Sequence, residues 1–478
     1  MKRFKHRAIT LALSSTMAGG AFADNPLDGI LDTSFAGGGI SMIHFDEDET
    51  VPFDKAHDVV VDSAGRTYVV GTVQTPNGER IGIARLDKDG LLDMSYGPDG
   101  LGRVVLHDVE GSEFNMSGTS AALDQTGALL VAGTVKDISN DFYVCRIDES
   151  GNPTDFSGIS FPCRSVSFDL GGPNADVLRD IVVQPDGKIV LVGHATASVN
   201  PLIVHGAIAR LHPDGNLDST FGNYGKFSFL PSHPTNTKVV QLTAAAVQDN
   251  GKIVVACHYK YSTFKDYDLC AVRFNSAGQN PLDTTFYIDG FKGYSTFDLH
   301  RNAESNAIAL VPRSHPQLLL DQSFVIAGRI ESGQNTGVYD GLIARISPNN
   351  GVPDPTFGTE GFLVDTEYGN LAFNDIEYQY DGSVTVAGAT ENPGGTRFFA
   401  GRFLRNGERD AEFNGGFGAI GIDIDAQTNF DEGVAMAFHS NRIVVVGSSQ
   451  RSDPVDFDYS VAALIRDRIF HDGVEGLD

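Results

Sequence analysis

Tryptophan, cysteine and basic residues are scarce in this sequence. Its 478 residues contain no Trp, four Cys and 35 Lys and Arg, against 62 Asp and Glu, which gives a formal net charge of −27. A surface this acidic repels phosphate backbones and anionic membranes, so we expect neither nucleic-acid nor membrane-surface binding. Without Trp, the sugar stacking used by many lectins has to depend on Tyr or Phe.

Long apolar runs and helical patterns are scarce as well. Beyond the N-terminus no apolar run approaches the ~18 residues of a transmembrane helix, so the mature chain is expected to have no membrane span. No stretch shows a helical period over about 11 residues. The 54 glycines have no collagen-like period, and with 41% apolar residues they indicate a folded protein rich in turns.

The first 23 residues have the features of an export signal. Basic residues at positions 2–7 precede a short apolar stretch at 8–18, and Ala21-Phe22-Ala23 fits a cleavage site. A membrane anchor is the alternative, but the stretch is too short to span a bilayer. Cleavage near Asp24 removes four basic and no acidic residues, so the net charge goes from −27 to −31. We expect a secreted or periplasmic bacterial protein.

One motif, Leu-Asp-x-x-Phe, recurs along the whole chain and is often followed by glycines. Seven copies place their aspartates 61, 62, 63, 65, 71 and 56 residues apart, which indicates a repeat architecture. The copy at Asp155 is shortened to Thr154-Asp155-Phe156. The seven aspartates are Asp32, Asp93, Asp155, Asp218, Asp283, Asp354 and Asp410.

Each repeat also contains four short β-rich runs. In residues 181–193, two runs flank an Asp-Gly turn of the kind that joins hairpins, and third and fourth runs follow at 206–211 and 225–230. Four strands repeated seven times predict an all-β fold, a seven-bladed β-propeller of four-stranded antiparallel blades. A sandwich array needs linkers that the sequence lacks, and a β-solenoid has shorter rungs without hairpins. The fifth repeat is irregular around 311–323.

The phase of the repeat predicts how the ring closes. A fourth-type strand at 39–45 has no preceding three, and the third-type strand at 459–465 has no fourth. We therefore expect the N-terminal strand to complete the last blade, which leaves no exposed sheet edge. The expected organisation is a signal at 1–23, one domain at 24–467 and a tail at 468–478.

These motifs resemble the delta-60 repeat family of secreted bacterial proteins. The resemblance rests on Leu-Asp-x-x-Phe-Gly and on Gln-Pro-Asp-Gly-Lys-Ile-Val at 184–190, and it extends over residues 31–465. It implies a propeller-like domain and supplies no catalytic residues.

Arginines recur at one position of the third β-rich run. A guanidinium offers a planar fork that a carboxylate accepts, so we expect each Arg to pair with a repeat aspartate while the Phe of the motif packs between blades. The alternative is a set of seven ligand sites. The arginines are Arg85, Arg146, Arg210, Arg273, Arg345 and Arg402, and the aspartates of these expected locks are Asp32, Asp93, Asp218, Asp283, Asp354 and Asp410.

Three further aspartates occupy matching positions at the start of the first β-rich run. They are Asp58, Asp180 and Asp375, and Ser120, Ala244 and Val434 are aligned with them in other repeats. Because inner strands line the axis of a propeller, these carboxylates are candidate ligands for a hard cation such as Ca²⁺. Solvated residues at strand starts are the alternative.

The four cysteines are expected to form disulfides in an exported protein. Cys145 and Cys163 lie on successive strands of one repeat, as do Cys257 and Cys270 of another, which predicts the pairs Cys145–Cys163 and Cys257–Cys270. Free buried thiols are the alternative. No Cys or His spacing indicates a metal site.

No catalytic motif is recognisable, so we expect a non-enzymatic protein. Zinc-protease, Walker, dinucleotide and nucleophile-elbow patterns are absent, and His57, His194 and His258 read as ordinary polar residues. The expected function is a monomeric binding or structural module for an unknown protein or glycan, without a cofactor other than the calcium considered above. The alternative is a hydrolase or lyase in the axial channel, which a funnel of converging His, Asp, Glu or Arg would favour.

Overall fold

The computed structural model describes residues 28–45, 53–106, 115–136, 139–156, 162–173, 175–231, 238–260, 266–286, 293–311, 323–333, 336–379, 381–425, 428–439, 441–451 and 456–466. The expected signal at 1–23, the tail at 468–478 and the interior of the irregular segment at 311–323 lie outside these residues. Within the described ranges, no helix is long and apolar enough to cross a membrane.

The regular elements of the described chain are β-strands, apart from one 3₁₀ turn, η1 (Phe413–Gly416). Sheet 1 contains β2 (Lys55–Val61), β3 (Thr67–Thr75), β4 (Gly78–Leu86) and β5 (Arg103–Leu106). Sheet 2 contains β6 (Asn115–Leu123), β7 (Leu129–Lys136), β8 (Asn140–Ile147) and β9 (Cys163–Val166). Sheet 3 contains β10 (Asp176–Val183), β11 (Ile189–Val199), β12 (Leu202–Leu211) and β13 (Lys226–Phe229). Sheet 4 contains β14 (Val239–Val247), β15 (Ile253–Lys260), β16 (Asp268–Phe274) and β17 (Tyr294–Phe297).

The remaining strands form three more groups of four. Sheet 5 contains β18 (Ala303–Leu310), β19 (Phe324–Glu331), β20 (Tyr339–Ile346) and β21 (Phe362–Asp365). Sheet 6 contains β22 (Leu371–Tyr378), β23 (Val384–Asn392), β24 (Gly395–Phe403) and β25 (Ala419–Ile422). Sheet 7 contains β26 (Asp431–His439), β27 (Arg442–Gln450), β28 (Phe457–Ile465) and β1 (Ile40–Ile43). The prediction of four-stranded antiparallel sheets is confirmed. A single parallel bridge between Val204 and Val239 joins sheets 3 and 4.

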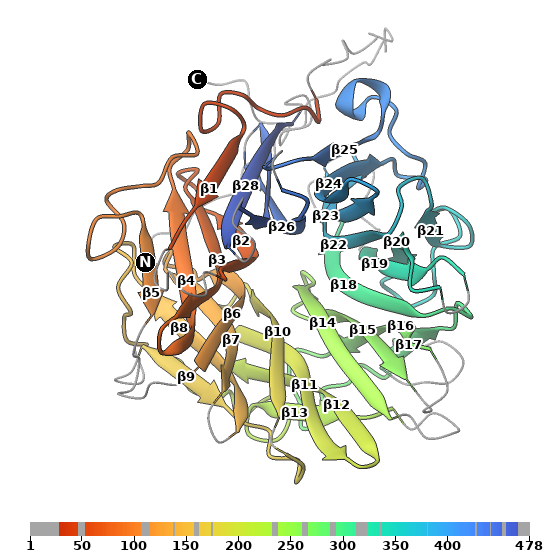
Figure 1. The fold of residues 1–478 in the computed structure, drawn as a ribbon. Coiled ribbons are helices and arrows are strands. Elements are labelled where there is room, and N and C mark those ends of the chain that lie inside the picture. Colours follow the sequence, from red (N-terminus) through yellow and green to blue (C-terminus); the bar gives the residue numbers. More distant parts are fainter. Residues whose placement is uncertain are drawn as a thin grey trace, which may run out of the picture.

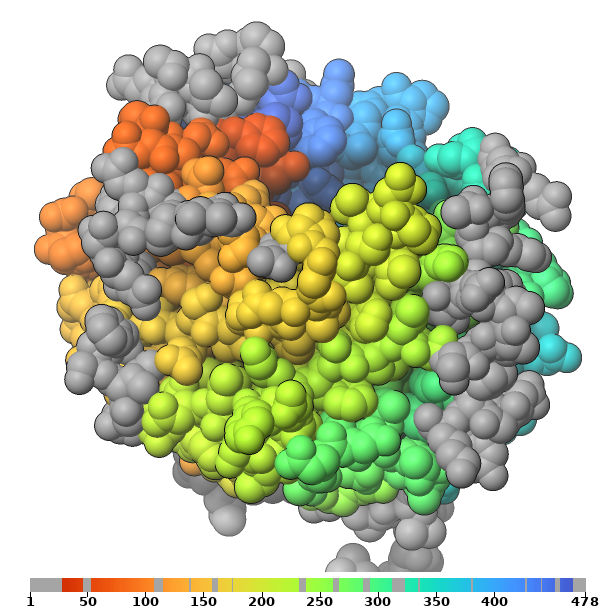
Figure 2. All heavy atoms as spheres, turned by 90° about the horizontal axis from the view of Figure 1, so that it is seen from below, coloured from red at the N-terminus to blue at the C-terminus, as the bar shows by residue number. Residues whose placement is uncertain are grey.

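The sheets are arranged around a common centre. Their first strands, β2, β6, β10, β14, β18, β22 and β26, face this centre (Figure 1). Seen from below, sheets 3 and 4 lie side by side on the outer face (Figure 2). The N-terminal strand β1 pairs antiparallel with β28, with Ile40 opposite Ala462.

The hydrophobic core is divided among the interfaces between sheets. Seven clusters are formed by described residues, and each combines side chains of two successive sheets. One of them joins sheet 7 to sheet 1 through residues such as Val461 and Val69. The aromatic residue of each repeat motif is at most 2% exposed, so the motif packs its ring as expected; these rings are Phe35, Tyr96, Phe156, Phe221, Phe286, Phe357 and Phe413.

Every first strand carries a β-bulge at the same place. In sheet 1 the register shifts between Ala56 and Asp58, which leaves His57 as the extra residue, and the other six first strands shift at matching positions. A bulge bends its strand and redirects a side chain. It also brings a backbone carbonyl against the second strand: a Cβ at Gly133 would lie 1.6 Å from the Ser117 oxygen. This contact explains the glycine near the end of the second run in six of the seven sheets; sheet 4 has Cys257 there.

Candidate functional site

The extra residues of the seven bulges meet in the middle of the molecule. A cavity of about 150 Å³ is lined by side chains from all seven first strands. The bulge residues in this lining are His57, Thr119, Arg179, Thr243, Asn306, Asn374 and Val434. Six of these seven side chains are polar, so the axis presents hydrogen-bonding groups.

A wider cavity of about 490 Å³ adjoins this ring and forms the channel mouth. The two cavities share His57, Thr119, Arg179, Thr243 and Asn306, so the space narrows from the mouth toward the ring. Every described residue that lines the mouth carries a polar side-chain group. These residues are His57, Thr119, Arg179, Gln241, Thr243, His258, Tyr267, Glu304, Ser305 and Asn306.

On one side of the ring of bulge residues, the polar side chains form hydrogen bonds within the protein. The Asn306 amide donates to the Phe373 carbonyl at 3.0 Å, and the Asn374 amide donates to the Gly433 carbonyl at 2.8 Å. The Thr243 and Ser305 hydroxyls lie 2.8 Å apart. On the other side, Arg179 is exposed to the cavity and has no ion pair or hydrogen bond within the described chain, which leaves a cation available to a ligand.

The histidines of the mouth are held neutral. Burial lowers the pKa of His57 to about 4, and the neighbouring Lys55 and Arg179 charges add to this effect. Burial also lowers the pKa of His258 to about 4, against an opposing effect of Glu304. His194, one strand behind the ring, has its pKa lowered to about 3 by burial and by Arg179. At neutral pH these imidazoles both donate and accept hydrogen bonds.

Sheet 4 builds one wall of the mouth. The His258 Nε2 atom lies 2.8 Å from Gln241 Oε1, and the His258 and Tyr267 rings meet edge to face with centroids 5.0 Å apart. The Tyr267 backbone is tied to sheet 5, because its N–H donates to Asn302 Oδ1 at 3.0 Å. The wall is therefore held from two sheets.

Both expected disulfides are present. Cys145 and Cys163 have an S–S distance of 2.05 Å, and Cys257 and Cys270 one of 2.12 Å. Each pair lies directly opposite on adjacent strands. Cys257 immediately precedes His258, so this disulfide joins β15 and β16 next to the wall of the mouth.

Glu304 is the one carboxylate among the described residues that line the mouth. Its Oε2 atom accepts from Arg329 Nη2 at 2.7 Å and from Nε at 3.0 Å. The Arg329 guanidinium also lies 4.3 Å from the centre of the Tyr339 ring. Because Arg329 neutralises Glu304, Arg179 is the uncompensated charge of the mouth.

The predicted cation ligands Asp58, Asp180 and Asp375 lie next to the bulge residues, as connectors between sheets. Each carboxylate accepts a backbone N–H from the first strand of the following sheet: Asp58 from Ala121, Asp180 from Ala245 and Asp375 from Met436, each at 2.7 Å. Ser120 Oγ lies 2.9 Å from Asp58 Oδ2 and 2.8 Å from Asp180 Oδ1. Val434 is the bulge residue of sheet 7, so Ala435 and not Val434 matches these aspartates.

Burial raises the pKa of these carboxyl groups despite their hydrogen bonds. The pKa of Asp58 rises to about 6 and that of Asp180 to about 7, and the pKa of Asp375 is raised by burial and by Glu377. A raised pKa means that the folded protein holds these protons more tightly than the unfolded chain. For Asp58 and Asp180 this contribution to stability is full below about pH 4 and is lost as the pH rises through about 6 to 7.

The calcium site stays a prediction. The hydrogen bonds of the three carboxylates determine the result that we expect when calcium is added. Across the described residues, no group of three or more His, Cys, Asp or Glu is arranged to hold a metal ion. Because backbone N–H groups already occupy the three carboxylates, we expect calcium to leave the melting temperature unchanged. A rise that a chelator reverses would restore the cation site.

Five predicted Arg–Asp pairs are formed. They are Arg85–Asp93, Arg210–Asp218, Arg273–Asp283, Arg345–Asp354 and Arg402–Asp410. In sheet 3, Arg210 Nε donates to Asp218 Oδ2 at 2.9 Å, and the guanidinium lies 4.5 Å from the centre of the Phe221 ring.

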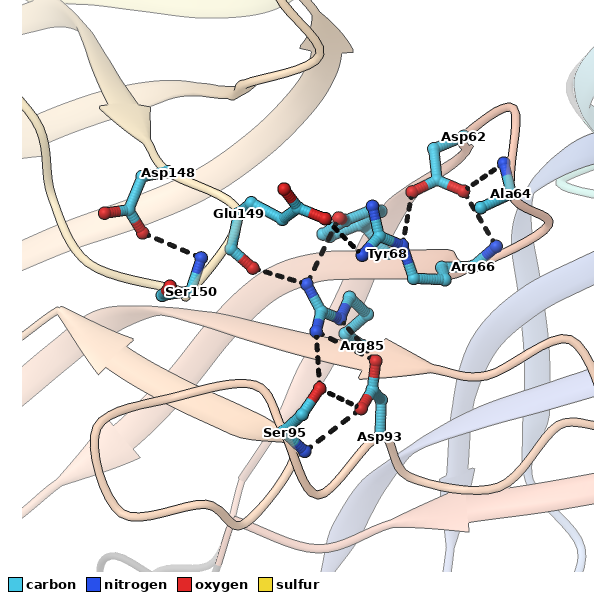
Figure 3. Close-up of polar contacts among 10 residues, drawn as sticks. All are labelled: Asp62, Ala64, Arg66, Tyr68, Arg85, Asp93, Ser95, Asp148, Glu149 and Ser150. Carbon is cyan, nitrogen blue, oxygen red and sulfur yellow. Dashed lines mark hydrogen bonds and ion pairs between the residues drawn. The ribbon is translucent and has the colours of Figure 1, made fainter.

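The arginines also reach the following sheet. The second donor of Arg85 bonds the carbonyl of Glu149 at 2.5 Å, while Ser95 donates to Asp93 (Figure 3). Arg210 bonds the Ser276 carbonyl in the same way at 2.5 Å. The Asp and the aromatic residue of the motif therefore hold one guanidinium that ties two sheets together.

Two pairs differ from the prediction. Arg146 pairs with Asp124 at 2.9 Å, because the shortened Thr154-Asp155-Phe156 lacks the residues that would place Asp155 beside it. Asp32 pairs with Arg442 on β27, at 2.6 Å, because the third strand of sheet 7 has Ala463 at the Arg position. Arg442 continues the pattern, since its Nη1 donates to the Lys88 carbonyl at 2.5 Å.

Arg179 was not predicted from the sequence, and His57 and His258 were interpreted as ordinary polar residues. A usable signal existed: the residue before each Asp58-type position is polar in six of seven repeats. That residue stands out only once the bulge is known, since the bulge places it on the channel side of its strand.

One family model matches a short part of this chain. Residues 184–221 match the model of a family described as "Domain of unknown function (DUF5122) beta-propeller". The search of curated proteins found no match. The matched segment contains the hairpin, Arg210 and the motif at Asp218, which are the parts that tie the sheets together.

Several solved structures match this chain at low identity and with TM-scores below 0.5. A protein of unknown function from Dyadobacter fermentans is 11% identical, with a TM-score of 0.44, and the match covers 90% of this chain and 100% of that one. A polysaccharide lyase described as an ulvan lyase is 10% identical, with a TM-score of 0.43 and coverage of 87% and 95%. An α-L-arabinofuranosidase from Fusarium graminearum is 9% identical, with a TM-score of 0.38 and coverage of 72% and 92%. No argument about activity rests on likenesses this distant. The sheets and the family match together make this chain a β-propeller.

Proposed function

We propose that the seven sheets form one closed ring, a seven-bladed propeller of the delta-60 repeat type over residues 24–467, exported by the N-terminal signal. Three observations support closure: β1 completes sheet 7, a core cluster joins sheet 7 to sheet 1, and side chains of all seven first strands line one cavity. Two disulfides agree with an oxidising destination outside the cytoplasm.

The proposed function of this propeller is to bind a small anionic ligand at the channel mouth. The observation that carries the proposal is Arg179, a cation without a partner among the described residues, in a cavity whose lining is entirely polar. Planar guanidinium groups recognise carboxylates and similar oxyanions through paired hydrogen bonds. The neutral His57 and His258 supply donors without a competing charge.

The local charge of the mouth favours an anion although the whole protein is acidic. Lys55 and Arg179 act on His57 against the opposing charge of Glu79, and Lys260 lies 5.2 Å from the centre of the Tyr267 ring. The net charge of −27 on the whole chain disfavours long polyanions, because the Debye length at physiological salt is about 8 Å and repulsion therefore persists at short range. A compact ligand avoids most of that repulsion.

Substitution of Arg179 by Met tests this proposal, because Met keeps the apolar stem and removes the charge. We expect acetate, phosphate, sulfate or galacturonate, compared at constant ionic strength, to stabilise the wild-type protein and not Arg179→Met. At a ligand concentration of 100 times Kd the stabilisation is about 2.7 kcal/mol. Differential scanning fluorimetry and calorimetry measure it.

Arg103→Met is the matched control, since Arg103 lies on the outer strand β5, outside the cavity. It should bind anions as the wild type does. Anion binding that is equal in Arg179→Met, or absent from the wild type, would reject the proposed function.

Catalysis at the same mouth is the second candidate. Converging His and Arg side chains favour it, and a neutral imidazole can accept a proton as a general base does. A two-carboxylate glycosidase mechanism has less support, because Glu304 is the one mouth carboxylate among the described residues. Incubation with short oligogalacturonides, followed by assays for new reducing ends and for unsaturated products, tests both reactions. No product in either assay would leave binding alone.

A further inference from the structure

We propose that the ligand of the channel mouth is an acidic sugar, a hexuronate bound with its carboxylate on Arg179 and its ring in the wider part of the cavity. This inference rests on the proposed anion-binding function and adds the class of the ligand. It is carried by the shape of the cavity, by the chemistry of its wall and by the carboxyl groups beneath Arg179.

The shape of the cavity predicts a ligand with a small charged end. The ring of bulge residues encloses about 150 Å³, and the mouth above it about 490 Å³. Arg179 belongs to both spaces, so it meets the end of a ligand that points inward. The wider space then holds a larger body, which a simple anion such as acetate lacks.

The wall of the mouth fits a body rich in hydroxyl groups. None of the described lining residues is aliphatic, which disfavours a fatty acid or an aromatic acid. Gln241 Oε1, the Thr243 hydroxyl and the Asn306 amide N–H groups bond within the protein, so the Gln241 amide N–H groups and Asn306 Oδ1 are the donor and acceptor that these residues offer. Tyr267 adds an aromatic surface that is half-buried, against which the C–H groups of a sugar ring can pack.

The carboxyl groups below the ring favour a monoanion. Asp58, Asp180 and Asp375 line the narrow space next to Arg179. A dianion such as phosphate or sulfate brings a second negative charge toward them, whereas one carboxylate is balanced by one guanidinium. The titratable groups that face this space are these three aspartates, His57 and Arg179; the segments of β6, β14 and β18 in its lining contribute none.

Calorimetry with matched sugars tests the inference. Galacturonate and glucuronate should bind about ten- to hundredfold more tightly than galactose and glucose, which lack the charge-assisted hydrogen bond, and more tightly than acetate, which lacks the ring. Tyr267→Leu should weaken uronate binding about tenfold and leave acetate binding unchanged. Tyr224→Leu is the control, because Tyr224 is 76% exposed on the loop between β12 and β13.

The outcomes separate this inference from the proposed function. Uronates that bind no more tightly than acetate overturn the sugar class and leave anion binding in place. Phosphate or sulfate that binds more tightly than the uronates also overturns it. Equal binding of galactose and galacturonate overturns both proposals. A melting temperature of Tyr267→Leu close to that of the wild type shows that the variant is folded.

Discussion

Replacing Arg210 with alanine is expected to lower the free energy of unfolding by about 3–5 kcal/mol, because it leaves the Asp218 carboxylate buried without its ion-pair partner. Arg210 and Asp218 are 1% and 0% exposed. The substitution also removes the bond to the Ser276 carbonyl in sheet 4 and the guanidinium that covers Phe221. Chemical denaturation measures the change.

Arg146→Ala is the matched control. Arg146 and Asp124 are 21% and 16% exposed and belong to one sheet, so we expect a loss of about 1 kcal/mol or less. Arg210→Lys should recover little of the loss, since an ammonium cannot reproduce the planar fork. Adding Asp218→Ala to Arg210→Ala should restore part of the stability. Similar losses for Arg210→Ala and Arg146→Ala would show that the connection between sheets contributes nothing.

The second large effect is expected from Gly133→Ala. The added methyl group would lie 1.6 Å from the Ser117 carbonyl oxygen, so the bulge of β6 has to open. We expect a loss of about 1–3 kcal/mol, the usual cost of forcing an extra carbon into a packed interior. Thermal denaturation measures it, and the β-sheet circular dichroism spectrum shows whether the fold persists.

Sheet 4 accommodates a Cβ at this position, because its matching residue is Cys257, opposite Leu242. Ala256→Gly, one residue earlier and away from the bulge contact, is the control and should cost about 0.5–1 kcal/mol through backbone entropy. A melting temperature for Gly133→Ala equal to that of the wild type would mean that β6 opens as readily as β14. The presence of glycine at position 133 would then need an explanation other than the contact with the Ser117 oxygen.

The architecture was predictable because its signals are local and repeat seven times. The Asp-Gly turns, the alternating strands and the motif around Asp218 each specify a conformation within a few residues, so the four-stranded sheets and both cysteine pairs followed from the sequence. The structure differs from the prediction where a repeat is incomplete. Arg146 and Arg442 found partners that only the folded arrangement brings near them.

The candidate site was less predictable, because no single repeat contains it. Arg179, His57 and His258 come from three different sheets, and a bulge places two of them on the axis. The aspartates next to the bulges looked like cation ligands from their position in the strand. Their backbone partners belong to the following repeat, about 60 residues away in each case, which no local pattern reveals.

The pairing of β1 with β28 has a consequence for the order of folding. Asp32 and Arg442 are 410 residues apart, so sheet 7 cannot assemble until almost the whole chain has been synthesised. Contacts this distant in sequence carry a large loop-closure cost and slow the rate of folding. A chain cut short before β28 would leave β1 without a partner and the edge of β27 open to other molecules. Completion of the last sheet therefore marks a chain that extends through β28, and products that end before it are expected to aggregate or to be degraded.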